Sequence, residues 1–434
     1  MSTARSVLID ITPLRISPAF RRIFVARLIS LIAIGLLLVS VPVQMWDLTQ
    51  SSAQVGAATA VTGITTFVGM LLGGVLADRV DRKYLILTGR TAAALAFAGL
   101  TVNAFADTPS VAALYLLGGL DGLIGALSAA ALMAAVPTLI ARRHLAAVGA
   151  LSAITVRIGT AVSPGIAGIV IGAAGVEWAY AAATVIATIT VAILTGLPSM
   201  PPQAAIADDS APTAPESAAA EPATTAPAPP PPLFAFLRSQ RIVAAVMVTG
   251  VLAMFAPGVV ALLPALVAER FGSNAQITGL MFAAVSVGAL ISAVASGWIS
   301  SVARPGLLLA GTLTATFGLL ILFGLAPFAW LAIGLLVIIG FGEAVMEVVR
   351  YLLIQQHTPG PLLGRVNGIW MAQEVGGVTV GALVAGALGS VWAAADAIVY
   401  YAAALLVAAL LAAGVLGSLR TVRRDTETDP VGAN

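Results

Sequence analysis

The sequence predicts an all-α membrane protein with twelve transmembrane helices, arranged as two six-helix bundles. Of the 434 residues, 59% are hydrophobic and only 9% are charged, which is too few charges for a water-soluble surface. Twelve apolar runs are long enough to cross a bilayer, since about 30 Å of hydrocarbon requires roughly 20 helical residues. A stretch rich in Pro, Ala and acidic residues, at 198–239, separates the first six runs from the last six.

The first bundle is expected at residues 23–197, after a tail formed by residues 1–22. Its runs should be helices, because lipid cannot satisfy the open edge of a strand. The first run is too long for a cleaved signal peptide and is interpreted as a retained span. The six runs lie near residues 23–46, 53–77, 84–106, 110–138, 147–171 and 176–197.

Residues 198–239 are expected to be a disordered linker, because this stretch has no apolar helical face. The second bundle should occupy residues 240–417, followed by a tail at 418–434. Two equal halves joined by a long loop are typical of a transporter built from two related bundles. The second six runs lie near residues 240–266, 276–300, 306–326, 329–354, 366–390 and 393–417.

Basic residues predict the orientation in the membrane. Of the 21 Lys and Arg residues, only Arg270 falls in a loop expected outside, while Arg27, Arg157 and Arg350 fall within spans or at their edges. The others are expected in the tails, in the loops on one side, or within a turn of these. Because cytoplasmic loops carry an excess of Lys and Arg, both termini and the linker are predicted to be cytoplasmic.

Composition also excludes several functions. The chain has no Cys and only two His residues, so no metal site and no cofactor are expected. A net charge of +2 argues against a nucleic-acid partner. The sequence lacks the phosphate-binding pattern G-x-x-x-x-G-K-[ST], which argues against an ATP-driven pump, and no nucleophile–base pattern suggests a membrane enzyme.

A dense charge cluster follows the second run, where residues 74–83 read GVLADRVDRK. The segment resembles the signature G-x-L-A-D-R-x-G-R-K of the major facilitator superfamily, with Asp81 in place of a glycine. The resemblance implies a cytoplasmic gating motif made of Gly74, Asp78, Arg79, Arg82 and Lys83. In it, Asp78 would face the start of span 11, and the basic residues would pair with acids or helix C-termini near spans 4 and 6. The alternative is a positive anchor that only fixes topology.

A second motif lies in span 5, where residues 159–168 read GTAVSPGIAG. It resembles the antiporter motif G-x-x-x-G-P-x-x-G-G of the same superfamily, through Gly159, Pro164 and Gly168. Small residues at this spacing let helices approach closely, and a proline bends the span. Ordinary small-residue packing is the alternative interpretation.

Further stretches resemble the enterobactin exporter branch of the superfamily. This resemblance implies export of a catecholate siderophore from the cytoplasm across the inner membrane, by a carrier that works as a monomer in the lipid bilayer. Our hypothesis is that protons drive this export. Multidrug and macrolide efflux carriers share several of these motifs, so a lipophilic drug is the alternative substrate. The stretches are SPAFRRIFVARLIS (17–30), VGMLLGGVLADRVDRK (68–83), YLLGGLDGLIGAL (115–127), TVRIGTAVSPGIAG (155–168), ARPGLL (303–308) and TPGPLLGRVNGIW (358–370).

Ionisable residues inside spans are costly and usually face a cavity or a partner. In the first bundle, Arg27 lies about one turn into span 1. Asp121 lies near the middle of span 4, and Arg157 lies at a similar depth in span 5, so the two could meet. All three are candidates for substrate binding or proton coupling.

In the second bundle, Glu343, Glu347 and Arg350 lie on one face of span 10, because they are spaced by four and three residues. Glu347 and Arg350 are expected to form a structural ion pair. Glu343 and Glu374, on span 11, have no helical partner. A desolvated carboxylate can load and unload a proton, so these two join Asp121 as candidate proton carriers.

Overall fold

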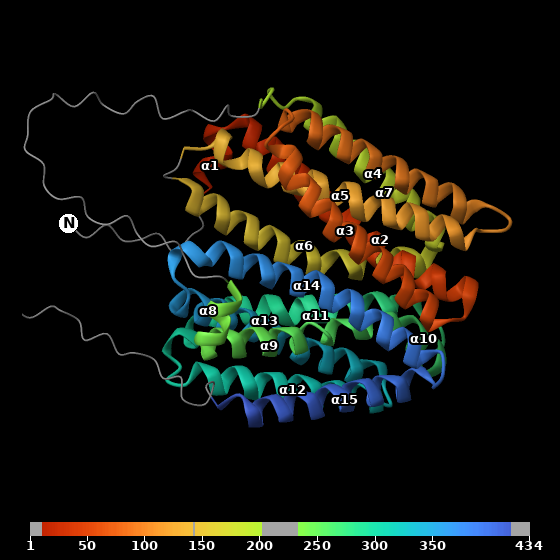
Figure 1. Cartoon of the computed structure of the whole chain (residues 1–434). Helices are drawn as coiled ribbons and strands as arrows, with labels where there is room; N and C mark the ends of the chain where they lie inside the picture. The colour runs from red at the N-terminus through yellow and green to blue at the C-terminus, as the bar shows by residue number, and fades with distance from the viewer. Residues whose placement is uncertain (1–10, 142–143, 202–232, 418–434) are drawn as a thin grey trace, which may run out of the picture.

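The computed structural model describes residues 11–141, 144–201 and 233–417. Within these ranges, twelve helical segments are long and apolar enough to cross a membrane, so the predicted all-α fold with twelve spans is confirmed. Figure 1 shows the spans running side by side along one axis. The short helices α1 (Thr12–Ile16) and α8 (Leu233–Ser239) lie at the same end of the molecule, which we call the terminal end. The opposite end is called the far end.

The N-terminal bundle contains six long helices. Several begin where the sequence supplies a cap: Ser17, Ser51 and Asp81 accept hydrogen bonds from backbone N–H groups of the first turn. Pro42 and Pro164 are accommodated inside two of the helices. The helices are α2 (Pro18–Thr49), α3 (Ser52–Ala77), α4 (Arg82–Phe105), α5 (Val111–Leu139), α6 (Leu145–Ala174) and α7 (Val176–Thr195).

The C-terminal bundle begins after α8 and supplies the other six spans. Its seventh span consists of three pieces: α9 (Arg241–Ala253), the 3-10 helix η2 (Ala256–Leu262) and α10 (Leu263–Arg270). The remaining elements are α11 (Ala275–Ala295), which continues into η3 (Ser296–Ser301), then α12 (Pro305–Leu325), α13 (Ala329–His357), α14 (Gly360–Gly389) and α15 (Ala394–Val415).

The structure differs from the predicted elements in three places. The seventh span is not one continuous α-helix, because Pro257 and Pro264 each lack the N–H that an α-helical interior needs, and the chain winds into 3-10 geometry there. Residues 233–239, predicted as linker, form α8. The helices α2 and α14 begin five and six residues earlier than expected, at Pro18 and Gly360. The tail residues 1–10 and 418–434 and the linker residues 202–232 lie outside the described residues.

The two bundles repeat one packing scheme. In the N-terminal bundle, α5 packs against α3 and α4, and α4 also packs against α7. In the C-terminal bundle, the spans six positions later do the same: α13 packs against α11 and α12, and α12 against α15. This correspondence indicates that the halves share one architecture.

The bundles meet along two helix pairs, α3 with α14 and α6 with α11. Both pairs are closely packed toward the far end, where Gly56 lies against the backbone of Ala382 and Gly168 lies against Gly279. At the terminal end the helices separate: a Cβ added to Gly74 or Gly364 would meet no atom within 4 Å. The close glycine contacts between the bundles therefore lie at the far end, and Gly74 and Gly364 make none at the terminal end.

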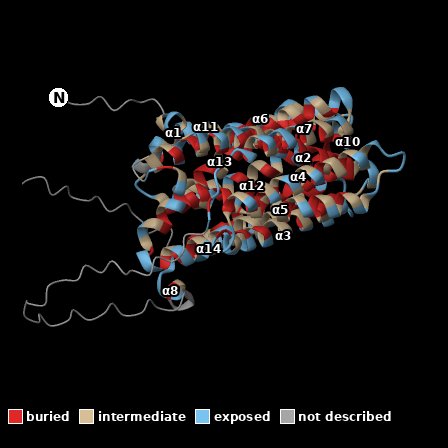
Figure 2. Cartoon of the chain, turned by 90° about the horizontal axis from the view of Figure 1, so that it is seen from above, coloured by how far each residue is buried: buried red, intermediate tan, exposed pale blue. Residues whose placement is uncertain are grey.

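Burial follows the pattern expected of a protein in lipid. Figure 2 shows buried residues between the helices and exposed residues on their outer faces. Large apolar side chains such as Val102, Leu116 and Trp330 are more than two-thirds exposed, at 73%, 73% and 77%. These side chains suit contact with hydrocarbon, which explains why so few charges are needed.

Candidate functional site

Three adjoining cavities connect the charged residues of the two bundles. A cavity of 430 Å³ lies between α2, α3, α5 and α14, and its lining is mostly apolar. It shares Asp121 with a 320 Å³ cavity inside the N-terminal bundle, and it shares Glu374 with a 320 Å³ cavity between α6 and the C-terminal bundle. The two charged centres therefore border the same apolar cavity, and we call these three cavities together the central path.

The N-terminal charged centre consists of Asp121, Arg90 and Arg27. Arg90 attracts Asp121 electrostatically, and Arg27 lies near enough to repel Arg90. Both Arg90 and Asp121 line the cavity inside this bundle, together with the hydroxyl groups of several Ser and Thr residues. The Nε atom of Arg90 is buried and has no hydrogen-bond partner among the described residues.

Sequence reasoning missed Arg90. It was grouped with the basic residues within a turn of the loop after span 2, but α4 begins at Arg82, so Arg90 lies two turns inside the helix. The grouping was wrong for this residue. The signal that could have found it is an arginine inside the third apolar run. The next run contains a single acid, Asp121, and buried charges usually lie beside a partner of opposite charge.

The C-terminal charged centre contains an ion pair that crosses between the bundles. Arg157 Nη2 on α6 donates to Glu347 Oε2 on α13 over 2.8 Å, and the two side chains are 36% and 45% exposed. Arg157 therefore takes its carboxylate from the other bundle rather than from Asp121. Glu347 in turn is paired with Arg157, not with Arg350 as expected from their spacing on one helix.

Arg350 is instead the most enclosed charge of the centre, with 1% of its surface exposed. Its Nη2 atom donates to Gln373 Oε1 over 3.1 Å, and Gln373 Nε2 donates to the carbonyl of Met247 over 3.2 Å. The guanidinium lies 5.2 Å from the ring centroid of Trp370. The carboxylates of Glu374 and Glu347 attract it electrostatically, but its Nε and Nη1 atoms are buried and have no hydrogen-bond partner among the described residues.

Glu343 and Glu374 both line the cavity of the C-terminal centre. Glu343 makes no hydrogen bond or ion pair within the described part of the chain, and the carboxylate of Glu347 repels it electrostatically. Glu374 lies between the two arginines of this centre and the apolar cavity. The acids that were singled out in the sequence thus face the cavity between the bundles.

The loop between α3 and α4 is tied to its own bundle. Asp81 accepts hydrogen bonds from the amides of Lys83 and Met200, over 2.8 and 3.0 Å, and from the Ser199 hydroxyl. Burial alone would raise the pKa of Asp81, but these hydrogen bonds and the charge of Lys83 outweigh it, so the pKa lies below its usual value.

The other residues of the proposed gating motif make few contacts. Arg82 is buried, and its Nε donates to the carbonyl of Ala77 over 3.3 Å. Asp78 is exposed, and its side chain has no hydrogen bond or ion pair within the described ranges. The contact between Asp78 and the start of α14 is thus not formed in this structure.

The span 5 motif lies at helix–helix contacts. Gly159 packs against Leu31 of α2, and Gly168 packs against Gly279 of α11 in the other bundle. A Cβ on Gly168 would lie 2.8 Å from the Cα atom of Gly279. Pro164 stands between them inside α6. The motif therefore spans one contact within the bundle and one contact between bundles.

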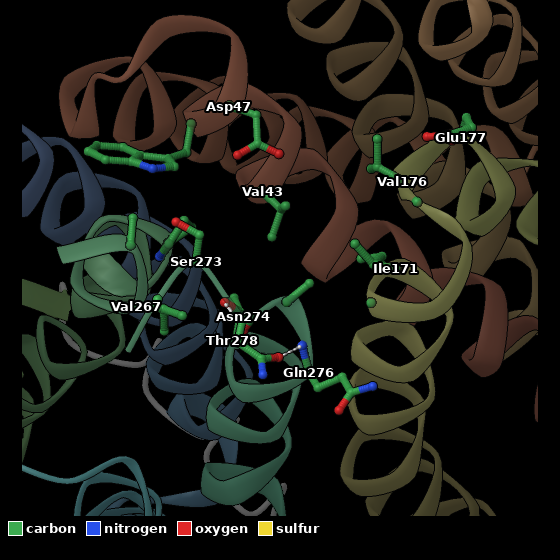
Figure 3. A pocket seen from close by; sticks show the side chains of 17 residues that line it. Val43, Asp47, Ile171, Val176, Glu177, Val267, Ser273, Asn274, Gln276 and Thr278 are labelled. Atoms are coloured by element: carbon green, nitrogen blue, oxygen red, sulfur yellow. Dashed lines mark hydrogen bonds between the residues drawn. The ribbon is translucent and has the colours of Figure 1, made fainter. Parts of the chain in front are cut away.

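A further cavity of 600 Å³ lies at the far end, between α2, α6, α10 and α11 (Figure 3). Figure 3 shows that Asp47 on α2 and Glu177 at the start of α7 line this cavity from the N-terminal bundle. Ser273, Asn274 and Gln276 line it from the C-terminal bundle. This cavity is larger than the central ones, but it lies beyond the packed glycines and away from both charged centres. We therefore take the central path as the candidate binding site.

The fold and this path define the class of protein: a multi-pass membrane transporter made of two six-span bundles around a charged central cavity. Residues 9–429 match the family described as transmembrane secretion effector. The chain belongs to that family, within the major facilitator superfamily.

Similar proteins and structures agree with this assignment. The chain is 37% identical to the enterobactin exporter EntS of Citrobacter koseri and 38% identical to that of Escherichia coli, over 97% of each chain. Among solved structures, the nucleoside transporter NupG has a TM-score of 0.70 at 12% identity, covering 93% of this chain and 99% of that one. A bacterial homologue of the iron transporter ferroportin, in an inward-facing state, has a TM-score of 0.69 at 16% identity, with the same coverage.

Proposed function

We propose that this protein exports a catecholate siderophore of the enterobactin type from the cytoplasm across the inner membrane. The observation that carries the proposal is identity of 37–38% to enterobactin exporters over 97% of both chains. The central path suits such a cargo, because aromatic rings would fit its apolar middle while anionic oxygens meet the arginines at either end.

The proposed mechanism is alternating access coupled to proton antiport. The terminal end, which carries nearly all Lys and Arg residues, would face the cytoplasm. In this conformation cargo would enter from the cytoplasm, and closure of the loop around Asp78 against α14 would accompany opening of the far end. Two bundles with one architecture, joined along two helix pairs, can rock about those contacts.

Asp121, Glu343 and Glu374 are the proposed proton carriers. Each lines a central cavity, where its carboxylate is reached from one side of the membrane at a time as the bundles rock. Glu374 is the favoured one of the three, because it lies between the arginines of the C-terminal centre and the apolar cavity that would hold the cargo.

Secretion by an iron-starved host tests the substrate. Deleting the gene should reduce secreted siderophore several-fold and raise the intracellular amount, and wild-type protein should restore secretion. Glu374→Gln should fail to restore it, whereas Arg304→Gln, on the exposed surface, should succeed. Unchanged secretion in the deletion strain would reject the siderophore assignment.

A second candidate function is export of lipophilic drugs, favoured by the apolar lining of the 430 Å³ cavity. In that case the deletion strain would become more susceptible to unrelated lipophilic drugs without a change in siderophore secretion. Proton coupling is tested separately in sealed vesicles. There an imposed pH gradient should drive uptake of the cargo in wild-type protein and not in Glu374→Gln.

A further inference from the structure

The N-terminal charged centre has an excess of positive charge. Arg90 and Arg27 lie close enough to repel each other, and Asp121 is the acid that faces them. The other acids of the described N-terminal bundle lie at helix ends, where Asp47, Asp81 and Glu177 are examples. A cation that is buried without full compensation is costly, so the site is poised to accept a second anion.

The geometry of Arg90 leaves room for that anion. Its buried Nε lacks a hydrogen-bond partner among the described residues, although a buried N–H of this kind is nearly always paired. The guanidinium borders a 320 Å³ cavity, so the missing acceptor can come from a bound molecule. A hydroxyl group on the same wall can add a hydrogen bond. The Thr66 hydroxyl has no hydrogen-bond partner among the described residues and can donate to the anion, whereas the hydroxyls of Ser30, Thr62 and Thr190 already donate within the protein.

Asp121 is placed to leave Arg90 when a cargo arrives. It lies at the junction of the cavity beside Arg90 and the apolar cavity between the bundles. Gly125, which has no side chain, also lines the wall, and among the described residues a Cβ on Gly125 would meet within 4 Å only Asp121 Oδ1, at 3.6 Å. The carboxylate therefore has free space beside it.

We infer that Arg90, supported by Arg27, forms an anion-binding subsite for the cargo, and that Asp121 occupies this subsite in the empty carrier. The ligand class is an aromatic anion with a carboxylate or catecholate group. Its oxygens accept hydrogen bonds from Arg90, and its ring lies in the adjoining apolar cavity. The inference rests on the proposed transport function, but it does not depend on the siderophore being the cargo.

The test compares two probes that differ in one group on the ring: a dihydroxybenzoate, whose carboxylate is anionic, and the matching dihydroxybenzamide, whose amide is neutral. Their affinities are measured by calorimetry with the full-length protein in lipid nanodiscs. Wild-type protein should bind the anion more tightly than the amide. Arg90→Gln should weaken anion binding by about tenfold to a hundredfold, the range of a charge-assisted hydrogen bond, and leave amide binding within about twofold. Arg304→Gln, an exposed surface control, should match wild type.

Asp121→Asn tests the same inference in the opposite direction, because it removes the carboxylate that competes with the anion for Arg90. It should tighten anion binding by about threefold or more and leave the amide unaffected. The double variant Arg90→Gln/Asp121→Asn replaces both charges by neutral groups of similar size. The double variant should keep the fold and show no preference for the anion. It therefore tests the subsite even if Arg90→Gln alone fails to fold.

The inference is overturned if wild-type protein binds both probes equally, or if Arg90→Gln weakens both to the same extent. It is also overturned if Asp121→Asn weakens anion binding. Secretion assays report separately on the proposed function. Normal siderophore export with no role for Arg90 would reject the subsite alone, whereas Arg90-dependent anion binding without any siderophore phenotype would reject the substrate alone.

Discussion

The two bundles share a packing scheme but differ in the charges they present to the cavity. The N-terminal centre has two arginines and one acid, namely Arg27, Arg90 and Asp121. The C-terminal centre has three acids, Glu343, Glu347 and Glu374, and two arginines. One arginine is Arg350, and the other is Arg157, which comes from α6 of the N-terminal bundle. The scaffold is fixed by small residues at helix contacts, so the chemistry of each half is free to differ. We propose that the N-terminal centre binds the anion and that Glu374 of the C-terminal centre is the favoured proton carrier.

The largest expected effect comes from removing the enclosed cation of the C-terminal centre. Arg350→Met removes the buried charge that attracts Glu374 and Glu347, and it leaves Gln373 Oε1 without its donor. We expect a loss of about 3 kcal/mol of stability, as for other broken buried pairs, measured by thermal unfolding in detergent. Arg90→Met should cost less, because Arg90 has fewer fixed hydrogen bonds. An equal loss in both variants would remove this distinction between the centres.

The contact between the bundles at the far end should be nearly as sensitive. Gly168→Ala places a Cβ 2.8 Å from the Cα atom of Gly279, which is backbone and cannot move aside. We expect a loss of about 1–3 kcal/mol, typical of overpacking. Gly149→Ala, in the same helix, meets no atom within 4 Å and should be neutral or stabilising.

The same substitution should also open the far end. Because the chain has no cysteine, Ser273→Cys beside the far-end cavity gives a single labelling site. Maleimide should react with it faster when Gly168→Ala is present. Unchanged labelling and unchanged stability would show that this glycine contact does not hold the bundles together.

A smaller effect is expected for the ion pair that crosses between the bundles. Arg157 and Glu347 are 36% and 45% exposed, so a double-mutant cycle of Arg157→Gln and Glu347→Gln should give a coupling free energy of about 0.5–1 kcal/mol. The charge swap Arg157→Glu/Glu347→Arg should recover part of it. A cycle between Arg304 and Glu347 is the control, and it should give no coupling.

The smallest effect should be at the loop between α3 and α4. Asp81→Asn weakens the cap of α4 and the hydrogen bonds from Ser199 and Met200, costing about 0.5–1 kcal/mol. Because the folded pKa lies below the usual value of 3.8, this stabilisation is complete above about pH 4 and is lost as the pH falls through the folded pKa. The difference in melting temperature between the two proteins should be constant from pH 5 to 8 and shrink in stronger acid.

Much of the fold follows from the sequence because lipid imposes simple rules. Twelve apolar runs had to become helices, and the charge cluster after span 2 had to lie in a loop. The seventh span was harder, because Pro257 and Pro264 lie in a run whose hydropathy is that of a normal span. Hydropathy measures solvation, not the hydrogen bonds that proline removes.

The candidate site was predicted only in part. The acids Asp121, Glu343 and Glu374 were found because a charge in an apolar run is conspicuous. Their partners were not, because depth in the membrane does not fix the direction in which a side chain points. Arg157 and Asp121 have similar depths, yet Arg157 reaches the other bundle. Gln373 and Trp370, which enclose Arg350, carry no signal in a single sequence.

The broken seventh span has a consequence for biosynthesis. The hydroxyl of Tyr401 donates to the carbonyl of Phe255 over 2.6 Å, and the Glu269 carboxylate accepts from the amide of Ala394 over 2.9 Å. Both partners belong to the last span or its first turn, so they are translated more than a hundred residues later. During synthesis the seventh span therefore enters the translocon or the bilayer before the Phe255 carbonyl and the Glu269 carboxylate have their hydrogen-bond donors. A chain truncated before residue 394 should therefore have an incompletely folded second half. We expect membrane quality control to degrade it.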